Sequence, residues 1–159
     1  MADSTHTAIY KRILVPTDGS DVSAVAEQAA IEFARAHGSE IVALSVAQTY
    51  PAYAAAEASM AVDPTLDNDA LRRWAERNVG RVGAAAAGAG VACTQLTVFS
   101  HSASDAILDS AREHGCDLIF MGSHGRRGLS RLLAGSETQK VLAGAEVPVM
   151  VLRPKGAAR

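Results

Sequence analysis

The chain has 159 residues, a formal net charge of −2, 48% apolar residues and 20% charged residues. This length suits one domain with a substantial core, and the composition is that of an ordinary soluble globular protein. The small net charge gives no reason to expect nucleic acid or an anionic membrane as the main partner, so anion binding would need a local site. No apolar run approaches the roughly 20 residues of a membrane span, and the polar first residues favour a cytoplasmic location.

We expect a flexible N-terminus at residues 1–9, one domain at 10–154 and a flexible tail at 155–159. Cys93 and Cys116 are the two cysteines of the chain, and both lie in or beside apolar stretches. Two lone cysteines provide neither a disulfide framework nor a zinc-binding set. We therefore expect them to be reduced residues that pack in the interior.

The first predicted strand is a short apolar run at residues 13–15. A helix follows it, since Ser20 or Asp21 provides a cap and Gly38 provides a stop. Residues 40–48 form the second predicted strand. Four apolar residues recur at helical spacing on the predicted helix: Val25, Ala29, Phe33 and Ala36.

Residues 49–68 have no clear period, and a stretch of this length inside a compact domain is usually functional or mobile. From about Asp69 a helix is predicted, and the glycines within residues 88–90 end it. Trp74 falls on the apolar face of this helix, so we expect it in the core. The residues of that face are Leu71, Trp74, Ala75, Val79 and Val82.

The second half of the chain continues the alternation of strands and helices. Its predicted elements are a strand at 91–99, a helix at 102–115, a strand at 116–122, a helix from Ser136 toward Leu142, and a strand at 146–154. Continuous apolar runs in the strands are typical of parallel sheets that helices cover on both faces. The sequence therefore predicts a single open, doubly wound α/β sheet of five strands.

In such sheets a ligand binds beyond the carboxyl ends of the strands, where the strand order reverses. The first strand runs into residues 16–20, with the sequence PTDGS, and the fourth runs into residues 122–128, with the sequence GSHGRRG. If the strand order is 3-2-1-4-5, the first and fourth strands are neighbours at the reversal. These two loops would then face each other across one crevice.

The second of these loops has the features of a phosphate-binding loop. Its glycines permit close backbone approach and positive φ, so consecutive N–H groups can converge on an anion. Ser136 then begins a helix whose free amides favour negative charge, and Thr138 adds a hydroxyl. One glycine pair after a strand is often only a turn, but the full spacing Gly122-x2-Gly125-x9-Gly135-Ser136 favours phosphate binding.

Several polar side chains near these loops have two interpretations. Asp18 is either a turn residue that caps the following helix, or an acceptor for a ribose hydroxyl or a divalent ion. His124 either contacts phosphate or is an exposed loop residue. The arginines of the loop either raise the local positive potential or are ordinary solvated side chains: Arg126, Arg127 and Arg131.

The sequence supports binding better than catalysis, and we assign no catalytic residue. It contains no Ser-His-Asp, His-x-x-x-His or paired-carboxylate arrangement at a useful spacing. It also lacks the GxxxxGK[ST] motif, and with it the lysine that stabilises transition-state charge in P-loop enzymes. A metal is expected only as the Mg²⁺ that a nucleotide brings with it.

The chain resembles the universal stress protein family over about residues 10–154. The resemblance is carried by ILVPTDGS at the first strand, IVALSVA at the second, the MGSHG…GS spacing, and VPVMVLRP at the last strand. The glycine–serine spacing is similar to the signature of the family's ATP-binding branch. The resemblance implies an adenine nucleotide alpha-hydrolase-like fold, strand order 3-2-1-4-5, and ATP, ADP or AMP bound between the first and fourth strands.

The resemblance also implies roles for individual residues. Pro16, Thr17 and Asp18 would line the ribose and adenine side, and the backbone of Val46 would meet adenine. Met121 and Gly122 would flank the ribose. The phosphates would lie against Gly125, Arg126, Gly135, Ser136, Glu137 and Thr138.

Three functions remain open from the sequence. The first is a nucleotide-binding regulator of the stress response that acts through unknown protein partners. The second is a slow ATPase or phosphotransferase in which Asp18 or His124 assists. The third is a dimeric interaction protein with a vestigial pocket. The apolar fifth strand, at Val147–Leu152, would be a sheet edge, and exposed edges invite pairing, so we predict a homodimer through this strand.

Overall fold

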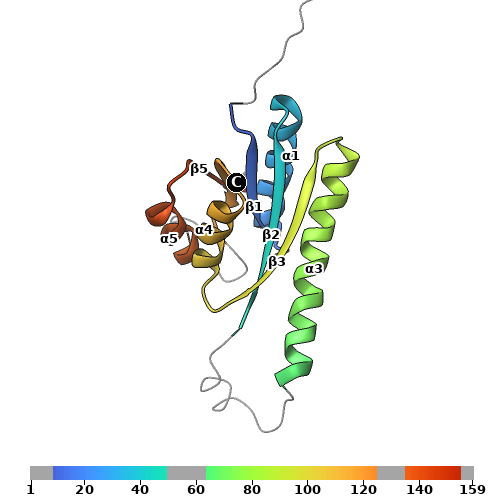
Figure 1. Cartoon of the computed structure of the whole chain (residues 1–159), viewed down its shortest axis with the longest axis vertical. Coiled ribbons are helices and arrows are strands. Elements are labelled where there is room, and N and C mark those ends of the chain that lie inside the picture. Colours follow the sequence, from blue (N-terminus) through green and yellow to red (C-terminus); the bar gives the residue numbers. More distant parts are fainter. Residues whose placement is uncertain (1–8, 50–63, 125–134, 155–159) are drawn as a thin grey trace, which may run out of the picture.

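The computed structural model describes residues 9–49, 64–124 and 135–154 of the chain. It contains one sheet of five parallel strands in the order β3-β2-β1-β4-β5, which confirms the predicted fold class (Figure 1). The strands are β1 Arg12–Pro16, β2 Glu40–Gln48, β3 Cys93–Ser100, β4 Leu118–Gly122 and β5 Val149–Leu152. β5 is therefore shorter than the strand predicted at 146–154 and than its apolar core at Val147–Leu152.

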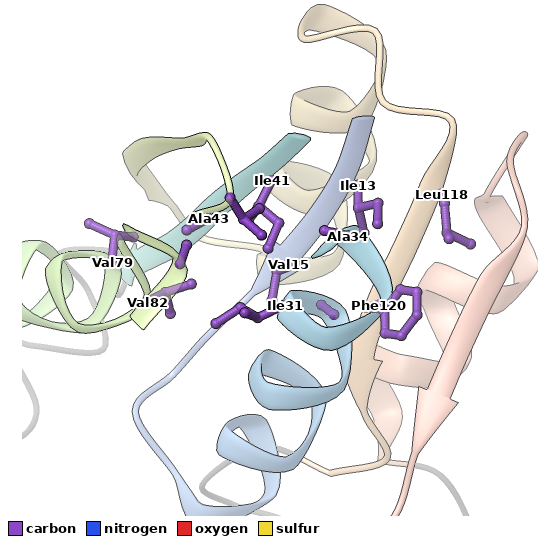
Figure 2. Close-up of a cluster of buried hydrophobic side chains, with 13 residues drawn as sticks. Ile13, Val15, Ile31, Ala34, Ile41, Ala43, Val79, Val82, Leu118 and Phe120 are labelled. Atoms are coloured by element: carbon purple, nitrogen blue, oxygen red, sulfur yellow. The ribbon is translucent and has the colours of Figure 1, made fainter. Parts of the chain in front are cut away.

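Helices cover both faces of this sheet. They are α1 Asp21–His37, α3 Pro64–Gly88, α4 Ala103–Glu113 and α5 Ser136–Gly144. α1 and α3 bury their apolar residues with Ile13, Val15 and Phe120 on one face, and Figure 2 shows this cluster. α4 and α5 pack on the opposite face, where Ile107 and Val141 join Leu14 and Ile119 of the sheet.

The predicted boundaries of α1 agree with the structure, but its predicted buried face is wrong by about one residue. The Ser20 side chain accepts the Ser23 N–H at 3.2 Å, and Gly38 ends the helix at φ 72°. Ala26, Ala30 and Ala34 are buried, whereas Ala36 is exposed. Small alanines let the helix lie close to the sheet, so the larger residues of the predicted face, among them Phe33, lie at its margin.

Two predictions about α3 are also corrected. The helix begins at Pro64 rather than near Asp69, and proline suits the first helical position because its missing N–H would have no partner there. Trp74 is not a core residue: it is half-buried, although Ala75 beside it is fully buried. No helix among the described residues is long and apolar enough to cross a membrane.

Both cysteines are free thiols in this structure, as expected. Cys116 lies in the core cluster beneath α4, and burial raises the pKa of its thiol from 9.0 to about 11. Cys93 is half-buried at the start of β3, and desolvation raises the pKa of its thiol as well.

Candidate functional site

A cavity of about 540 Å³ lies at the carboxyl ends of β1, β2 and β4, where the strand order reverses. Its volume falls within the range of small-molecule sites, about 300–1,000 Å³. The predicted site residues that line it are Pro16, Thr17, Asp18, Val46, Met121, Gly122, Gly135, Ser136, Glu137 and Thr138. Gly125 and Arg126 lie outside the described residues, as do Arg127 and Arg131.

On the β1 side of the cavity, the Thr17 side chain is already engaged by the fold. Its hydroxyl donates to Glu27 Oε1 at 2.5 Å and accepts the Gly19 N–H at 3.1 Å. The Ser23 hydroxyl donates to the same Glu27 oxygen at 3.0 Å, and Arg81 of α3 pairs with this carboxylate at 3.4 Å. Thr17 therefore shapes the loop that borders the cavity. Sequence reasoning missed Glu27, since its role depends on partners from three segments.

Asp18 organises the same loop through a turn of its own. Its Oδ1 accepts the Ser20 N–H at 3.0 Å, which is an Asx-turn contact. Ser20 in turn caps α1, so Asp18 holds the capping residue rather than capping the helix itself. This contact agrees in part with the turn interpretation of Asp18, and the carboxylate still lines the cavity.

On the β4 side, the end of β4 and the beginning of α5 are joined by hydrogen bonds. The Ser123 carbonyl accepts the Gly135 N–H at 2.8 Å and faces the Thr138 hydroxyl at 3.3 Å. That hydroxyl also lies 3.2 Å from the Gly122 carbonyl, to which it donates. These contacts fix the first turn of α5 against the end of β4, so the buried Thr138 side chain has a structural role.

The two described glycines of the predicted signature differ in what they accommodate. A Cβ at Gly122 would lie 2.9 Å from Val22 Cγ1 and 3.0 Å from the Val22 carbonyl oxygen, so the close approach of α1 requires glycine. A Cβ at Gly135 would meet atoms of the described residues only at 3.6 Å or beyond. Gly135 has φ −60°, and Gly122 is not among the described glycines with positive φ, so neither residue uses the positive φ that glycine permits.

The beginning of α5 presents backbone donors to the cavity. Gly135 is the N-cap and makes no side-chain capping bond, and the first N–H groups of a helix have no partner within the helix. Glu137 directs its carboxylate to α4, where Oε2 accepts the Ser104 N–H at 2.8 Å, and Oε1 pairs with Lys140 at 2.9 Å. Burial alone would raise the pKa of Glu137, but the bonds from Lys140 and Ser104 outweigh it and lower that pKa.

His124 places a polar atom without a partner beside these donors. Its Nδ1 lies 3.1 Å from the Ser123 hydroxyl. Its Nε2 is the one buried side-chain nitrogen or oxygen in the described part of the chain that has no hydrogen-bond partner. The residue lines the cavity, which favours a ligand contact over the exposed-loop interpretation. No three His, Cys, Asp or Glu side chains within the described segments are grouped so as to hold a metal ion.

The other half of the cavity is mainly apolar, with Gln48 of β2 as a polar residue in its lining. Its wall combines residues of β2, α3 and α4: Leu44, Val46, Leu71, Trp74 and Ile107. Sequence reasoning found Val46 only through the family resemblance and missed the others as lining residues. Apolar residues at helical spacing look the same in a sequence whether they face a sheet or a cavity.

The backbone of β2 continues beyond β1 in this apolar half. Alternate residues of β2 direct their N–H and C=O groups toward β1, and the Leu44 carbonyl accepts the Thr17 N–H at 2.8 Å. Val46 is the next residue with this orientation, and the ladder between β1 and β2 ends at the pair of Pro16 and Leu44. Val46 therefore offers one donor and one acceptor side by side at the cavity.

The fold and the cavity define a doubly wound α/β protein whose ligand site lies at the topological switch point. The chain belongs to the universal stress protein family, whose sequence model matches residues 9–153. A universal stress protein of Methanocaldococcus jannaschii is 33% identical over 146 residues, which cover 91% of this chain and 83% of that relative.

Solved structures agree with this assignment. The structure of a hypothetical protein of Methanocaldococcus jannaschii is 26% identical with a TM-score of 0.77, and the match covers 93% of this chain and 99% of that one. Two further structures share the fold at lower identity. One is a universal stress protein in complex with cAMP, at 22% identity, TM-score 0.61, and coverage of 90% and 96%. The other, from Archaeoglobus fulgidus, is in complex with dAMP, at 18% identity, TM-score 0.60, and coverage of 90% and 98%.

Proposed function

We propose that this chain is a regulatory protein of the stress response that binds an adenine nucleotide, ATP above all, in the cavity between β1 and β4. The observation that carries the proposal is the division of this cavity into two chemically different halves. One half has the N-terminus of α5 and His124, and the other is mainly apolar and contains the backbone of Val46 beyond the end of the β1–β2 ladder. A nucleotide combines an anion with a flat base and matches both halves.

The phosphates would lie at the beginning of α5. The N–H groups of Ser136, Glu137 and Thr138 fall in the first turn, where the helix dipole also favours negative charge. His124 Nε2 would donate to a phosphate oxygen when it is protonated. No described residue comes closer than 3.6 Å to the position of a Cβ at Gly135, so a side chain there would use space that we assign to the phosphates. Gly125 and Arg126 remain predicted phosphate contacts, and a triphosphate would bring its own Mg²⁺.

The base would lie in the apolar half. Adenine carries a donor at N6 and an acceptor at N1, and the C=O and N–H of Val46 form the complementary pair. Burial of the flat ring against Leu44 and Ile107 would add apolar contact. The cAMP and dAMP complexes of the two distant relatives support an adenine nucleotide as the ligand class.

The proposal is tested by the ligand that the protein carries and binds. Mass spectrometry of gently purified protein should detect an adenine nucleotide, and calorimetric titration of stripped protein should give saturable binding of ATP at one site. Competition with GTP, which carries a carbonyl where adenine has the N6 amine, should be much weaker. Absence of both the co-purified nucleotide and binding on titration would contradict the proposal.

A regulatory role predicts that bound ATP persists or turns over slowly. Phosphate release by purified protein should therefore be negligible on the timescale of binding. Phosphate release that survives extensive purification and disappears in Asp18→Ala would instead indicate the alternative function, a slow ATPase.

We also propose that the chain forms a homodimer through β5. This strand is one edge of the sheet, and Met150 on it is 42% exposed. An unprotected apolar edge is a site for strand pairing. Sedimentation should show a dimer that Met150→Lys dissociates, and a wild-type monomer at every concentration would refute the proposal.

A further inference from the structure

Leu71 and Trp74 of α3 line one end of the cavity. Trp74 is half-buried, whereas Ala75 next to it is fully buried and Val79 one turn later lies in the core cluster. The apolar stripe of α3 therefore has two parts. Its later residues pack on the sheet, and its earlier residues extend past the sheet into the cavity.

The position of Trp74 is fixed by polar contacts in the following two turns of α3. Asn78 Nδ2 donates to Ser45 Oγ at 3.3 Å, and both residues are buried. Ser45 directly precedes Val46 on β2, and Arg81 pairs with Glu27 of α1 at 3.4 Å. α3 is thereby tied to β2 and α1, so the indole is held on a rigid element at the same cavity as Val46.

We propose that Trp74, with Leu71 beside it, forms the wall against which the nucleobase packs. A large aromatic side chain offers a flat apolar surface to a base, and contacts of this kind are tolerant of base identity. Trp74 thus supplies affinity for the base that is independent of the phosphates, while the backbone of Val46 reads its edge. The inference rests on the proposed function, because it assumes that a nucleotide occupies this cavity.

The wild-type protein provides a direct readout, because Trp74 is its single tryptophan. Titration with ATP should change the indole emission saturably, with the same midpoint as calorimetric binding. Titration with inorganic tripolyphosphate, which lacks a base, should leave the emission unchanged. This measurement needs no variant and does not depend on whether a substituted protein folds.

Substitution should separate the base from the phosphates. Trp74→Ala should weaken ATP binding about 5- to 150-fold, since loss of an aromatic base contact costs about 1–3 kcal/mol. Trp74→Phe should retain most of the affinity for ATP. The dissociation constant of tripolyphosphate, measured by competition with ATP, should be the same in Trp74→Ala as in wild type. Leu71→Ala should also weaken ATP binding, whereas Leu142→Ala on the exposed side of α5 is the matched control and should not.

The outcomes distinguish this inference from the proposed function. If wild-type protein binds no adenine nucleotide, both fail. If it binds ATP but the indole emission and the affinity of Trp74→Ala stay unchanged, only the inference fails. Equal losses for ATP and tripolyphosphate in Trp74→Ala would also overturn it, because the residue would then act on the site as a whole.

Discussion

Substitutions at Gly122 and Gly135 should separate folding from ligand binding, although both glycines belong to one sequence signature. A Cβ at Gly122 would lie within 3.0 Å of the Val22 side chain and backbone, and backbone cannot move aside cheaply. Overpacking of this kind costs about 1–3 kcal/mol. For a chain of this size, a loss of about 2 kcal/mol lowers the melting temperature by about 4–8 °C. Gly122→Ala should therefore have a melting temperature below that of wild type by about this amount.

Gly135→Val should have the opposite profile. Among the residues that the structure describes, the nearest atoms to a Cβ at this position are 3.6 Å away, which is ordinary contact, and the backbone φ of −60° suits any residue. Loss of a favourable N-cap residue costs about 1 kcal/mol or less. The valine side chain would fill space that the phosphates need, so ATP binding should be abolished while the protein remains folded.

Thermal melting and calorimetric titration on the same samples provide the test. Gly88→Val is the matched control, because a Cβ there meets no atom of the described residues within 4 Å and the residue lies at the far end of α3 from the cavity-lining residues. Wild-type ATP affinity in Gly135→Val would refute the phosphate-binding role of this corner. An unchanged melting temperature in Gly122→Ala would refute the packing argument.

Two further predictions concern buried polar groups. Glu27→Ala should lower the free energy of unfolding in urea by about 1–3 kcal/mol, because it removes the carboxylate that accepts the buried Thr17 hydroxyl, whereas Ser23 keeps the Ser20 carbonyl as an acceptor at 2.9 Å. Glu27→Gln keeps one acceptor oxygen and should lose less; equal losses would contradict this reasoning. The raised pKa of Cys116, about 11, means that the folded state disfavours the thiolate. The contribution of the Cys116 thiol to the free energy of unfolding should therefore be fully present below pH 9 and be lost as the pH rises toward 11, so the decline should be smaller in Cys116→Ala. Native protein at pH 8 should resist alkylation at Cys116, and rapid alkylation there would contradict its burial.

Local signals in the sequence predicted the framework well, because they act over a few residues. Ser20 and Gly38 marked both ends of α1, and the continuous apolar strands indicated a parallel sheet with helices on both faces. The strand order came from family resemblance rather than from the pattern of residues. The start of α3 at Pro64 was missed because the residues that follow it break the apolar period.

The site was predictable in its position but only partly in its composition. Loop chemistry after β1 and β4 located the cavity, since carboxyl ends of neighbouring parallel strands meet at one edge. The apolar wall at Trp74 and the buried carboxylate of Glu27 were not predictable. Both depend on which way a helix faces and on partners far apart in the sequence, such as Thr17 and Arg81.

Crystallisation with excess ATP is the most direct test of nucleotide binding in this cavity. We predict density for the phosphates within hydrogen-bond distance of the N–H groups of Ser136 and Thr138, with the adenine edge on the backbone of Val46. A structure in which protein side chains fill this corner, or in which the nucleotide lies elsewhere on the surface, would contradict the proposed function.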